Sequence, residues 1–235
     1  MKLAIVGYGK MGRLIEQVAP EFGFETALKL DIDNNVGGAG ITRDNFRSID
    51  VAIEFSMPAV VVDNIEKISA LGVSMVVGTT GWFDGLDRAR AAVTRGGAGL
   101  VYSPNFSVGM QVFSRLVAAA AEQFSHERDY DAWAYEIHHK MKKDAPSGTL
   151  LKLEQVMKQA GFTRPIDVAS NRAGAIPGTH EIGFDSEADT ITLTHTARNR
   201  LGFARGALRA AQWVKGKSGV HEFGEVLFGT TEKQR

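Results

Sequence analysis

Three glycines near the start of the chain constrain its fold most strongly. A short apolar run over residues 3–6 leads into Gly7-Tyr8-Gly9-Lys10-Met11-Gly12, and residues 13–19 then carry apolar side chains at helical spacing. A strand, a glycine turn of this spacing and a helix form the dinucleotide-binding fingerprint, in which the glycines allow a tight turn, close approach of a pyrophosphate and close helix packing. Ordinary glycine turns share this spacing, so the rest of the chain has to support the assignment.

An acidic residue stands where the same fingerprint requires one. Residues 24–30 alternate like a second strand and end at Asp31, about 20 residues after the glycines. A carboxylate at this point accepts hydrogen bonds from a ribose 2′-hydroxyl, and Ile32 follows it where an arginine would accommodate a 2′-phosphate. We therefore predict NADH or NADPH as the cofactor, with a preference for NADH. Lys10 and Lys29 are the nearby cations that argue against this preference.

Strands and helices alternate through the first half of the chain. Apolar runs predict strands at residues 50–55, 73–77 and 99–102, and a helix after the first of these, with Ser56 as its cap and Pro58 in its first turn. This alternation predicts a Rossmann-like, doubly wound parallel sheet covered on both faces. Ligands of such sheets bind at the carboxyl ends of the strands, where this chain has two polar turns. The residues of these turns are Gly78, Thr79 and Thr80, and Ser103, Pro104, Asn105 and Phe106.

A group of basic side chains lies in the second half, in the stretch from Glu136 to Thr149. This stretch falls between a predicted strand at residues 132–138 and a predicted helix at residues 150–160, where a strand would place side chains and a loop would expose them. Lysines and an imidazole beside the free N–H groups of a helix start would bind a small substrate with more than one carboxylate. Runs of lysine and histidine are also common on solvated surfaces.

The second half otherwise combines long helices with several strands. We expect helices at residues 108–124 and 205–214, and strands at 168–171, 179–184 and 190–197. Consecutive strands with short turns predict an α+β domain with an open mixed sheet, whose outer face another subunit could cover in a homo-oligomer. The predicted domains are a dinucleotide-binding domain (residues 1–106), a substrate-binding and oligomerisation domain (107–203) and a C-terminal segment that returns to the first domain (204–235).

Composition excludes several classes of function. Lys+Arg and Asp+Glu both number 27, so the net charge is zero and no basic excess points to nucleic acid. The absence of cysteine rules out disulfides, thiolate metal sites and cysteine nucleophiles. No apolar run has the length of a membrane span or of a signal peptide, which predicts a cytoplasmic protein.

The basic stretch has a long pattern, Glu-x-His-His-x-x-Lys-x-Asp-Ala-Pro-Ser-Gly-Thr, that resembles the signature of the dihydrodipicolinate (4-hydroxy-tetrahydrodipicolinate) reductases. Segments similar to this family occur along the whole chain: Phe55-Ser56-x-Pro58, Val-Gly-Thr-Thr-Gly from Val77, Pro-Asn-Phe-Ser-x-Gly from Pro104, and Arg172-Ala173-Gly174. The glycine loop is shorter by one residue than in many members. The resemblance implies NADH- or NADPH-dependent reduction of 4-hydroxy-tetrahydrodipicolinate in the diaminopimelate route of lysine biosynthesis.

The resemblance also implies roles for individual residues. It assigns proton delivery to His138 and Lys142, an imidazole and an ammonium that would depress each other's pKa toward neutrality. It assigns the substrate carboxylates to His139, Gly148 and Thr149, and it implies a tetramer, which is common in the family. The implied cofactor contacts are residues 7–12, Asp31, residues 78–80 and residues 103–106.

Other polar residues receive structural interpretations. His180 and His195 are single histidines on predicted strands and are expected to be hydrogen-bonded structural residues. Arg172 is either a surface charge or a carboxylate ligand, and Asp144 is expected to orient the loop or to cap the helix that follows. We predict no metal site, because the histidines lack acidic partners at ligand spacing.

Three alternatives remain at this point. A two-domain dehydrogenase that acts on an amino acid such as aspartate would share the nucleotide-binding half, and only the loop at residues 136–149 discriminates against it. A dinucleotide sensor without catalysis would need neither His138 nor Lys142. A divergent member of the same family could keep the pattern and act on a changed substrate.

Overall fold

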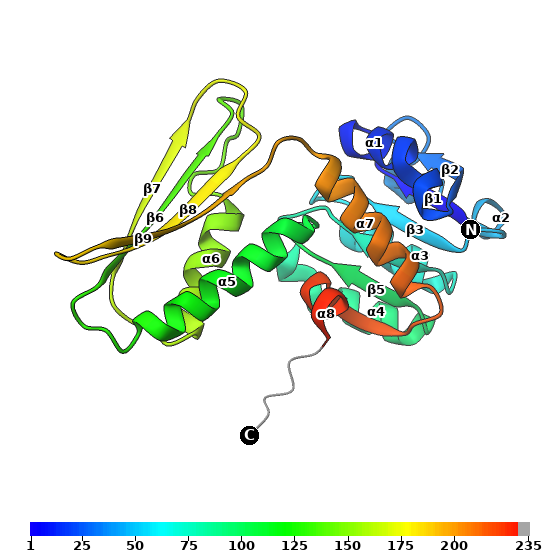
Figure 1. The fold of residues 1–235 in the computed structure, drawn as a ribbon. Helices are drawn as coiled ribbons and strands as arrows, with labels where there is room; N and C mark the ends of the chain where they lie inside the picture. The colour runs from blue at the N-terminus through cyan, green and yellow to red at the C-terminus, as the bar shows by residue number, and fades with distance from the viewer. Residues whose placement is uncertain (230–235) are drawn as a thin grey trace. The chain divides into compact units, whose positions relative to one another are not determined.

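The computed structural model describes residues 1–229, which fold as two compact units (Figure 1). One unit consists of Met1–Phe106 together with the chain from Phe203 onward, and the other is Ser107–Gly202. Residues 230–235, the last part of the predicted C-terminal segment 204–235, lie outside the described residues. Among residues 1–229, no helix has both the length and the hydropathy that crossing a membrane requires.

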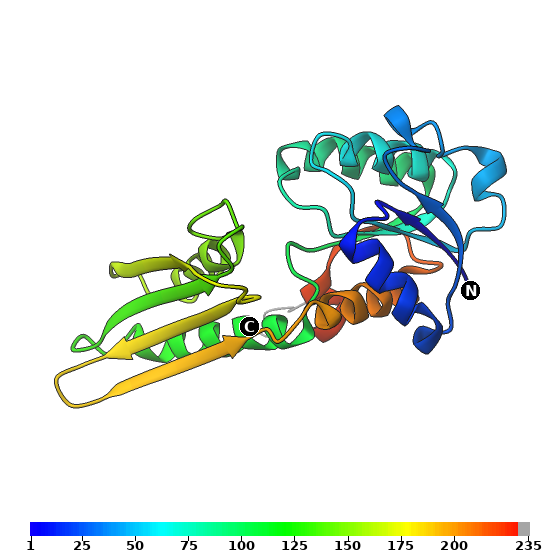
Figure 2. The same ribbon diagram turned by 90° about the horizontal axis from the view of Figure 1, so that it is seen from above.

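The first unit contains a six-stranded sheet in which every pairing is parallel, with the strand order β10-β5-β4-β3-β1-β2. Its strands are β1 (Lys2–Val6), β2 (Glu25–Leu30), β3 (Val51–Glu54), β4 (Ser74–Val77), β5 (Gly99–Tyr102) and β10 (Gly219–Glu222). Helices α3 (Val61–Ala70) and α4 (Leu86–Gly96) cover one face, and α1 (Lys10–Val18) and α7 (Leu201–Val214) cover the other (Figure 2). This arrangement confirms the predicted Rossmann-like, doubly wound sheet.

The central strands of this sheet are buried because helices cover both faces. Every residue of β3, β4 and β5 is buried, including Ala52 of β3 and Met75 of β4. These residues share a core with Ile65 and Ile68 of α3 and Val93 of α4. Parallel strands covered on both sides need continuous apolar runs, and such runs are what made these strands predictable.

The connection after β3 differs from the prediction. Helix α3 begins at Val61, and Ser56 does not cap it; the Ser56 hydroxyl donates instead to the buried carboxylate of Glu54. Pro58 lies in a turn before the helix, where the Val60 N–H donates to the Met57 carbonyl. A buried carboxylate requires hydrogen-bond donors. Because the Ser56 hydroxyl donates to Glu54, it does not cap a helix.

Several elements were not predicted. Strand β10, helix α4 and the short helices α2 (Arg43–Phe46) and α8 (Phe223–Phe228) are absent from the sequence interpretation. Three 3₁₀ turns were also missed: Ala19–Phe22, Val36–Gly38 and Phe83–Gly85. Apart from α4, each is only three to six residues long, which is too short for hydrophobic periodicity to identify.

The second unit contains a four-stranded mixed sheet with the order β7-β6-β8-β9. Strand β6 (Asp131–His138) pairs in parallel with β7 (Ile166–Arg172) and antiparallel with β8 (Thr179–Asp185), which pairs antiparallel with β9 (Thr190–Thr196). Helices α5 (Val108–Phe124) and α6 (Gly148–Gln159) share a core with the sheet, and both lie along the same side of it (Figures 1 and 2). The predicted open mixed sheet is therefore confirmed.

Candidate active site

The glycine turn of the first unit has the geometry that a bound dinucleotide needs. Gly7 has a φ of +91°, and a Cβ atom there would overlap the carbonyl of Phe55. A Cβ at Gly12 would overlap the Gly7 carbonyl, whereas a Cβ at Gly9 would meet no atom within 4 Å. Packing therefore requires Gly7 and Gly12, while Gly9 leaves the backbone open to a ligand at the start of α1.

A cavity of about 400 Å³ lies beside this turn, and its lining includes Gly7, Gly9, Asp31 and Ile32. Asp31 is half-buried, and its backbone N–H donates to Asn34 at 2.7 Å, so the residue is held at the end of β2 with its carboxylate beside the cavity. The residues around this cavity fit the adenosine part of a dinucleotide, because a carboxylate and an open glycine backbone stand next to one another.

One of the two cations that argue against an NADH preference is already engaged. The Lys29 ammonium lies 3.2 Å from the Glu16 carboxylate and 5.1 Å from the centre of the Tyr8 ring. The Tyr8 hydroxyl also donates to Glu16, and Arg13 lies over the same ring at 4.9 Å. Glu16 is therefore a charge partner of Lys29 near the turn.

The two threonines of the turn after β4 have different environments. The Thr79 hydroxyl is buried and donates to Glu54 at 2.6 Å, in the same cluster as Ser56 and Asn64, whereas Thr80 is exposed. Burial raises the pKa of Glu54, and the donors around it oppose that rise. The side chain of Thr79 thus supports the turn from within, and Thr80 is the threonine whose side chain a ligand can reach.

The turn after β5 also has buried members, Ser103 and Phe106. Phe106 is 2% exposed, and its ring packs against Phe55 at 6.3 Å and Phe223 at 4.8 Å. The Ser103 hydroxyl donates to the Asn105 carbonyl and accepts from the Asn105 N–H, which closes the turn. The side chain of Phe106 therefore belongs to the core, and Pro104 and Asn105 remain accessible in this segment.

In the second unit, strand β6 turns alternate side chains inward. Residues 132, 134, 136 and 138 are buried, which places Glu136 and His138 on the same face as two alanines of the core. The period of two along a strand explains this placement, because Glu136 and His138 are two positions apart. His139 is only partly buried, on the opposite side of the strand end.

Glu136 is completely buried, and its carboxylate is surrounded by hydrogen-bond donors. Its Oε1 atom accepts from the Ser147 N–H at 2.8 Å, from the Ser170 hydroxyl at 3.1 Å and from the Arg172 guanidinium at 2.7 Å, and its Oε2 atom accepts from the Ser147 hydroxyl. Burial works against the charge, but hydrogen bonds from Ser147 and Arg172 hold the pKa of Glu136 below its ordinary value. Arg172 is thus an internal partner of a carboxylate of this chain.

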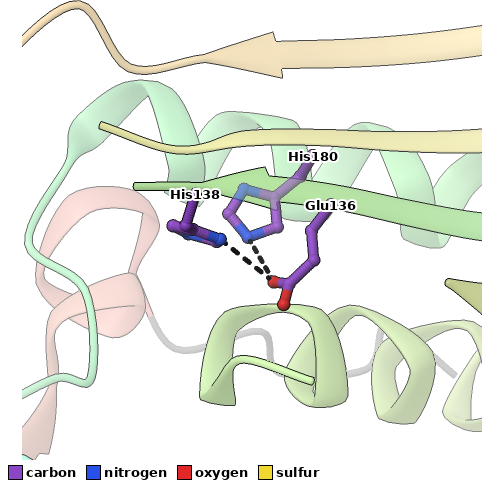
Figure 3. A group of neighbouring side chains, drawn as sticks. All are labelled: Glu136, His138 and His180. Atoms are coloured by element: carbon purple, nitrogen blue, oxygen red, sulfur yellow. Dashed lines mark ion pairs between the residues drawn. The ribbon is translucent and has the colours of Figure 1, made fainter. Parts of the chain in front are cut away.

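Two imidazoles approach the Oε2 atom of Glu136 from neighbouring strands (Figure 3). The distances from Oε2 are 3.5 Å to Nδ1 of His138 and 3.4 Å to Nε2 of His180, and the two rings meet edge to face at 5.0 Å. Burial lowers the pKa of His138 and lowers that of His180 to about 4. Both rings are therefore neutral near pH 7 before any ligand binds.

The loop after β6 brings Lys142 into the same electrostatic environment. The positive charge of Lys142 adds to the burial that lowers the pKa of His138, so the two predicted proton-transfer residues lie close enough to interact. The Lys142 ammonium is held by the Asp144 carboxylate at 2.8 Å and 2.9 Å. Hydrogen bonds from Lys142 and from the Gly148 N–H lower the pKa of Asp144 against the effect of burial. Asp144 therefore orients the loop, as predicted.

Helix α6 begins directly at the loop. Ser147 is its N-cap and accepts a hydrogen bond from the Leu150 N–H at 3.2 Å, so the cap is Ser147 and not Asp144. Gly148 is exposed and Thr149 is half-buried at the first turn, where backbone N–H groups and the helix dipole favour an anion. A helix start, an ammonium and a histidine of low basicity could together bind a carboxylate and donate a proton.

The reason given above against a metal site was wrong. The ligand atoms of Glu136, His138 and His180 lie within 4.8 Å of one another, so the histidines do have an acidic partner. However, the Glu136 carboxylate already has four donors, and the Arg172 guanidinium at 2.7 Å would repel a cation placed there. The group is better described as a cluster in which two imidazoles flank a carboxylate that serine and arginine donors hold.

The sequence does not identify the carboxylate at the centre of this cluster. Glu136 has no assigned role in the basic stretch or in the family pattern, Ser170 has none either, and His180 is expected to be a hydrogen-bonded structural residue without a named partner. The pairing of β6 with β8 sets Glu136 opposite His180, and its pairing with β7 sets Glu136 beside Ser170. The alternation along β6 could have flagged Glu136, since a carboxylate on an inward strand face must have partners.

Comparisons with known proteins cover both halves of the chain. The family model described as "Dihydrodipicolinate reductase, N-terminus" matches residues 1–106, and "Dihydrodipicolinate reductase, C-terminus" matches residues 109–227. The chain is 35% identical over 238 residues to the 4-hydroxy-tetrahydrodipicolinate reductase of Christiangramia forsetii, covering 97% of this chain and 98% of that one. It is 34% identical over 265 residues to the protein of the same name from Thiobacillus denitrificans, with 97% and 98% covered. A dipicolinate-bound dihydrodipicolinate reductase from Paenisporosarcina sp. TG-14 has a TM-score of 0.78 at 22% identity, covering 94% of this chain and 97% of that one.

Proposed function

The chain belongs to the dihydrodipicolinate reductase family, and from this premise we propose how its residues share the reaction. It is an NAD(P)H-dependent oxidoreductase that reduces 4-hydroxy-tetrahydrodipicolinate in the diaminopimelate route of lysine biosynthesis. The family match over residues 109–227 covers the loop that separates this function from an aspartate-type dehydrogenase or a sensor. Loss of NAD(P)H absorbance on addition of the substrate tests the function.

The single observation that carries the division of roles is the meeting of His138, Lys142 and the start of α6 in one loop region. His138 and Lys142 deliver the proton that must accompany hydride transfer to the ring. The His138 imidazole is neutral near pH 7 in the free protein, so the negative charge of the bound dicarboxylate has to raise its pKa before it can donate a proton. Lys142 contributes positive charge near the start of α6.

The two substrate carboxylates bind at the start of α6. His139, the backbone N–H of Gly148 and the hydroxyl of Thr149 hold them, with the helix dipole adding favourable charge. Asp144 occupies Lys142 and the Gly148 N–H in the absence of substrate, so a substrate carboxylate takes over contacts that Asp144 makes in the free protein.

The cofactor is held by the glycine turn and the neighbouring loops. Gly9 and the start of α1 face the pyrophosphate, Asp31 faces the ribose, and Thr80, Pro104 and Asn105 offer accessible groups at the strand ends. The other residues of the predicted set shape these loops from behind or beside the ligand. They are Tyr8, Lys10, Met11 and Gly78, and the buried Thr79, Ser103 and Phe106. The reduced nicotinamide supplies the hydride when it is bound.

We expect NADH to be used in preference to NADPH. Asp31 would repel a 2′-phosphate, Ile32 offers it no cation, and Lys29 is paired with Glu16. The kcat/KM values for the two cofactors, measured with the wild-type protein and Asp31→Ser, check this. The wild type should favour NADH, and the variant should lose most of that preference. A wild-type preference for NADPH would show that the interpretation of Asp31 is wrong.

We also propose a homo-oligomer formed through the outer face of the mixed sheet. Trp133, Tyr135 and Ile137 point to this face along β6 and are only partly buried in the isolated chain. Their register partners on β8 include Gly183, against which the Trp133 ring packs. Light scattering should give a mass that is a multiple of the chain mass, and Tyr135→Lys should lower it. A monomer at micromolar concentration would contradict the proposal.

A further inference from the structure

The two carboxylate oxygens of Glu136 have different surroundings. Three donors, from Ser147, Ser170 and Arg172, converge on Oε1, and together they offset the desolvation of the charge. The Oε2 atom is placed differently. It accepts from the Ser147 hydroxyl and faces both imidazoles, at 3.5 Å from His138 and 3.4 Å from His180 (Figure 3).

The same carboxylate also fixes the start of α6. Ser147, which donates to both oxygens of Glu136, is the N-cap of α6 and directly precedes Gly148. One buried group therefore contacts both the ring of the proposed proton donor and the helix start that is proposed to hold the substrate carboxylates.

We propose that Glu136 is a positioning residue for the reduction, whose carboxylate holds the His138 imidazole and the start of α6 in one arrangement and favours the protonated form of that imidazole. The proposal rests on the proposed function of His138 as proton donor. Glu136 itself touches neither substrate nor cofactor in this account; it acts through His138 and Ser147. His180 is its second imidazole partner and keeps Oε2 shielded from water.

The charges around His138 define what Glu136 contributes. Burial lowers the pKa of His138, and the positive charges of Lys142 in the loop and Arg172 on β7 lower it further. The negative charges of Glu136 on β6 and Asp144 in the loop raise it. His180 on β8 is neutral near pH 7, and it is in turn influenced by His195 on β9. Glu136 is the buried negative charge of this set, so removing it should make the His138 imidazole lose its proton at lower pH.

The test compares Glu136→Gln with Glu181→Gln over a range of pH. Glu181 lies on β8 next to His180 but on the outer face of the sheet, which makes it a matched control. A proton donor must be protonated, so kcat falls as pH rises through its pKa. We expect Glu136→Gln to move this fall to lower pH by about one unit and to reduce kcat at pH 8 about tenfold, with the KM for NADH little changed. Glu181→Gln should leave the profile as in the wild type.

A double variant separates this inference from the proposed function. Glu136 affects protonation only through His138, so adding Glu136→Gln to His138→Gln should leave the pH profile of kcat unchanged, while any further loss of kcat that does not depend on pH reports the start of α6. Equal pH profiles for Glu136→Gln and the wild type, or a pH profile that shifts when Glu136→Gln is added to His138→Gln, would overturn the inference while leaving His138 as the donor. Full kcat in His138→Gln alone would instead overturn the proposed donor, and the inference with it.

A measurement on the unaltered protein guards against failure of Glu136→Gln to fold. With Nδ1 of neutral His138 facing a carboxylate, its proton should reside on Nδ1. Nitrogen NMR of the histidine rings distinguishes the two tautomers. A resonance for His138 with the proton on Nε2 would overturn the inference.

Discussion

Replacing Lys142 or His138 by alanine should lower kcat by about two to four orders of magnitude, the range typical of a lost general acid. The physical reason is that both residues share one electrostatic environment at the start of α6, where a proton must reach the reduced ring. Cofactor affinity should change little, because the glycine turn and Asp31 lie in the other unit. Steady-state kinetics together with the Kd for NADH checks both parts.

Lys143→Ala is the matched control for Lys142→Ala. Lys143 is the next residue of the same loop and is exposed. If kcat falls as much in Lys143→Ala as in Lys142→Ala, the net charge of the loop determines the rate, and the Lys142 ammonium has no specific role. Unchanged kcat in both Lys142→Ala and His138→Ala would refute the assigned roles.

Acidification should begin to destabilise the second unit at a higher pH than the one at which ordinary carboxylates begin to titrate. The pKa of His180 is lowered by burial from 6.5 to about 4, so the unfolded chain takes up a proton at higher pH than the folded one. The contribution of neutral His180 to the free energy of unfolding is fully present above pH 6.5 and is lost as the pH falls to about 4. Its size is about 3 kcal/mol, and His138, whose pKa is also lowered, adds to the loss in the same direction.

Urea unfolding at pH 7.5 and pH 4.5 measures this effect. His180→Gln, which keeps a polar side chain at this position but cannot take up a proton, should show a much smaller difference between the two pH values than the wild type. His126→Gln, at an exposed position in the same unit, should behave like the wild type. An equal loss of stability in the wild type and in His180→Gln would mean that other groups dominate acid unfolding.

The first unit was largely predictable because its signals are local. The strand, glycine turn and helix at residues 2–18 follow one another in sequence, and β3, β4 and β5 are continuous apolar runs. The tight turn at Gly7 and the close helix packing at Gly12 follow from the glycine pattern, since both depend on backbone conformation within the turn. By contrast, β10 has only four residues, and it is a strand because β5 offers it a partner from a distant part of the chain.

The site in the second unit was only partly predictable. His138 at the end of β6 and Lys142 and Asp144 in the following loop lie within seven residues of one another, so their proximity follows from connectivity. The contacts of Glu136 with Ser170, Arg172 and His180 depend instead on how three strands align. No local pattern encodes that register, which explains why the carboxylate was overlooked and why His180 had no partner in the sequence interpretation.

Thr79 and Phe106 illustrate a related limit. A motif places residues at a ligand-binding turn, but it does not say which side chains point outward. The Thr79 hydroxyl is taken by the buried carboxylate of Glu54, and the Phe106 ring by two other aromatic rings of the core. The accessible neighbours, Thr80 and Asn105, are distinguished only when burial is known.

Reduction of freshly generated substrate tests the central claim most directly. The condensation product of pyruvate and aspartate semialdehyde is supplied to the purified protein with NADH or NADPH, and the absorbance of the reduced nicotinamide is followed. We predict that absorbance falls in step with the amount of condensation product and stays constant when either precursor is left out. A folded protein that binds NADH but consumes neither cofactor in the presence of this product would contradict the account.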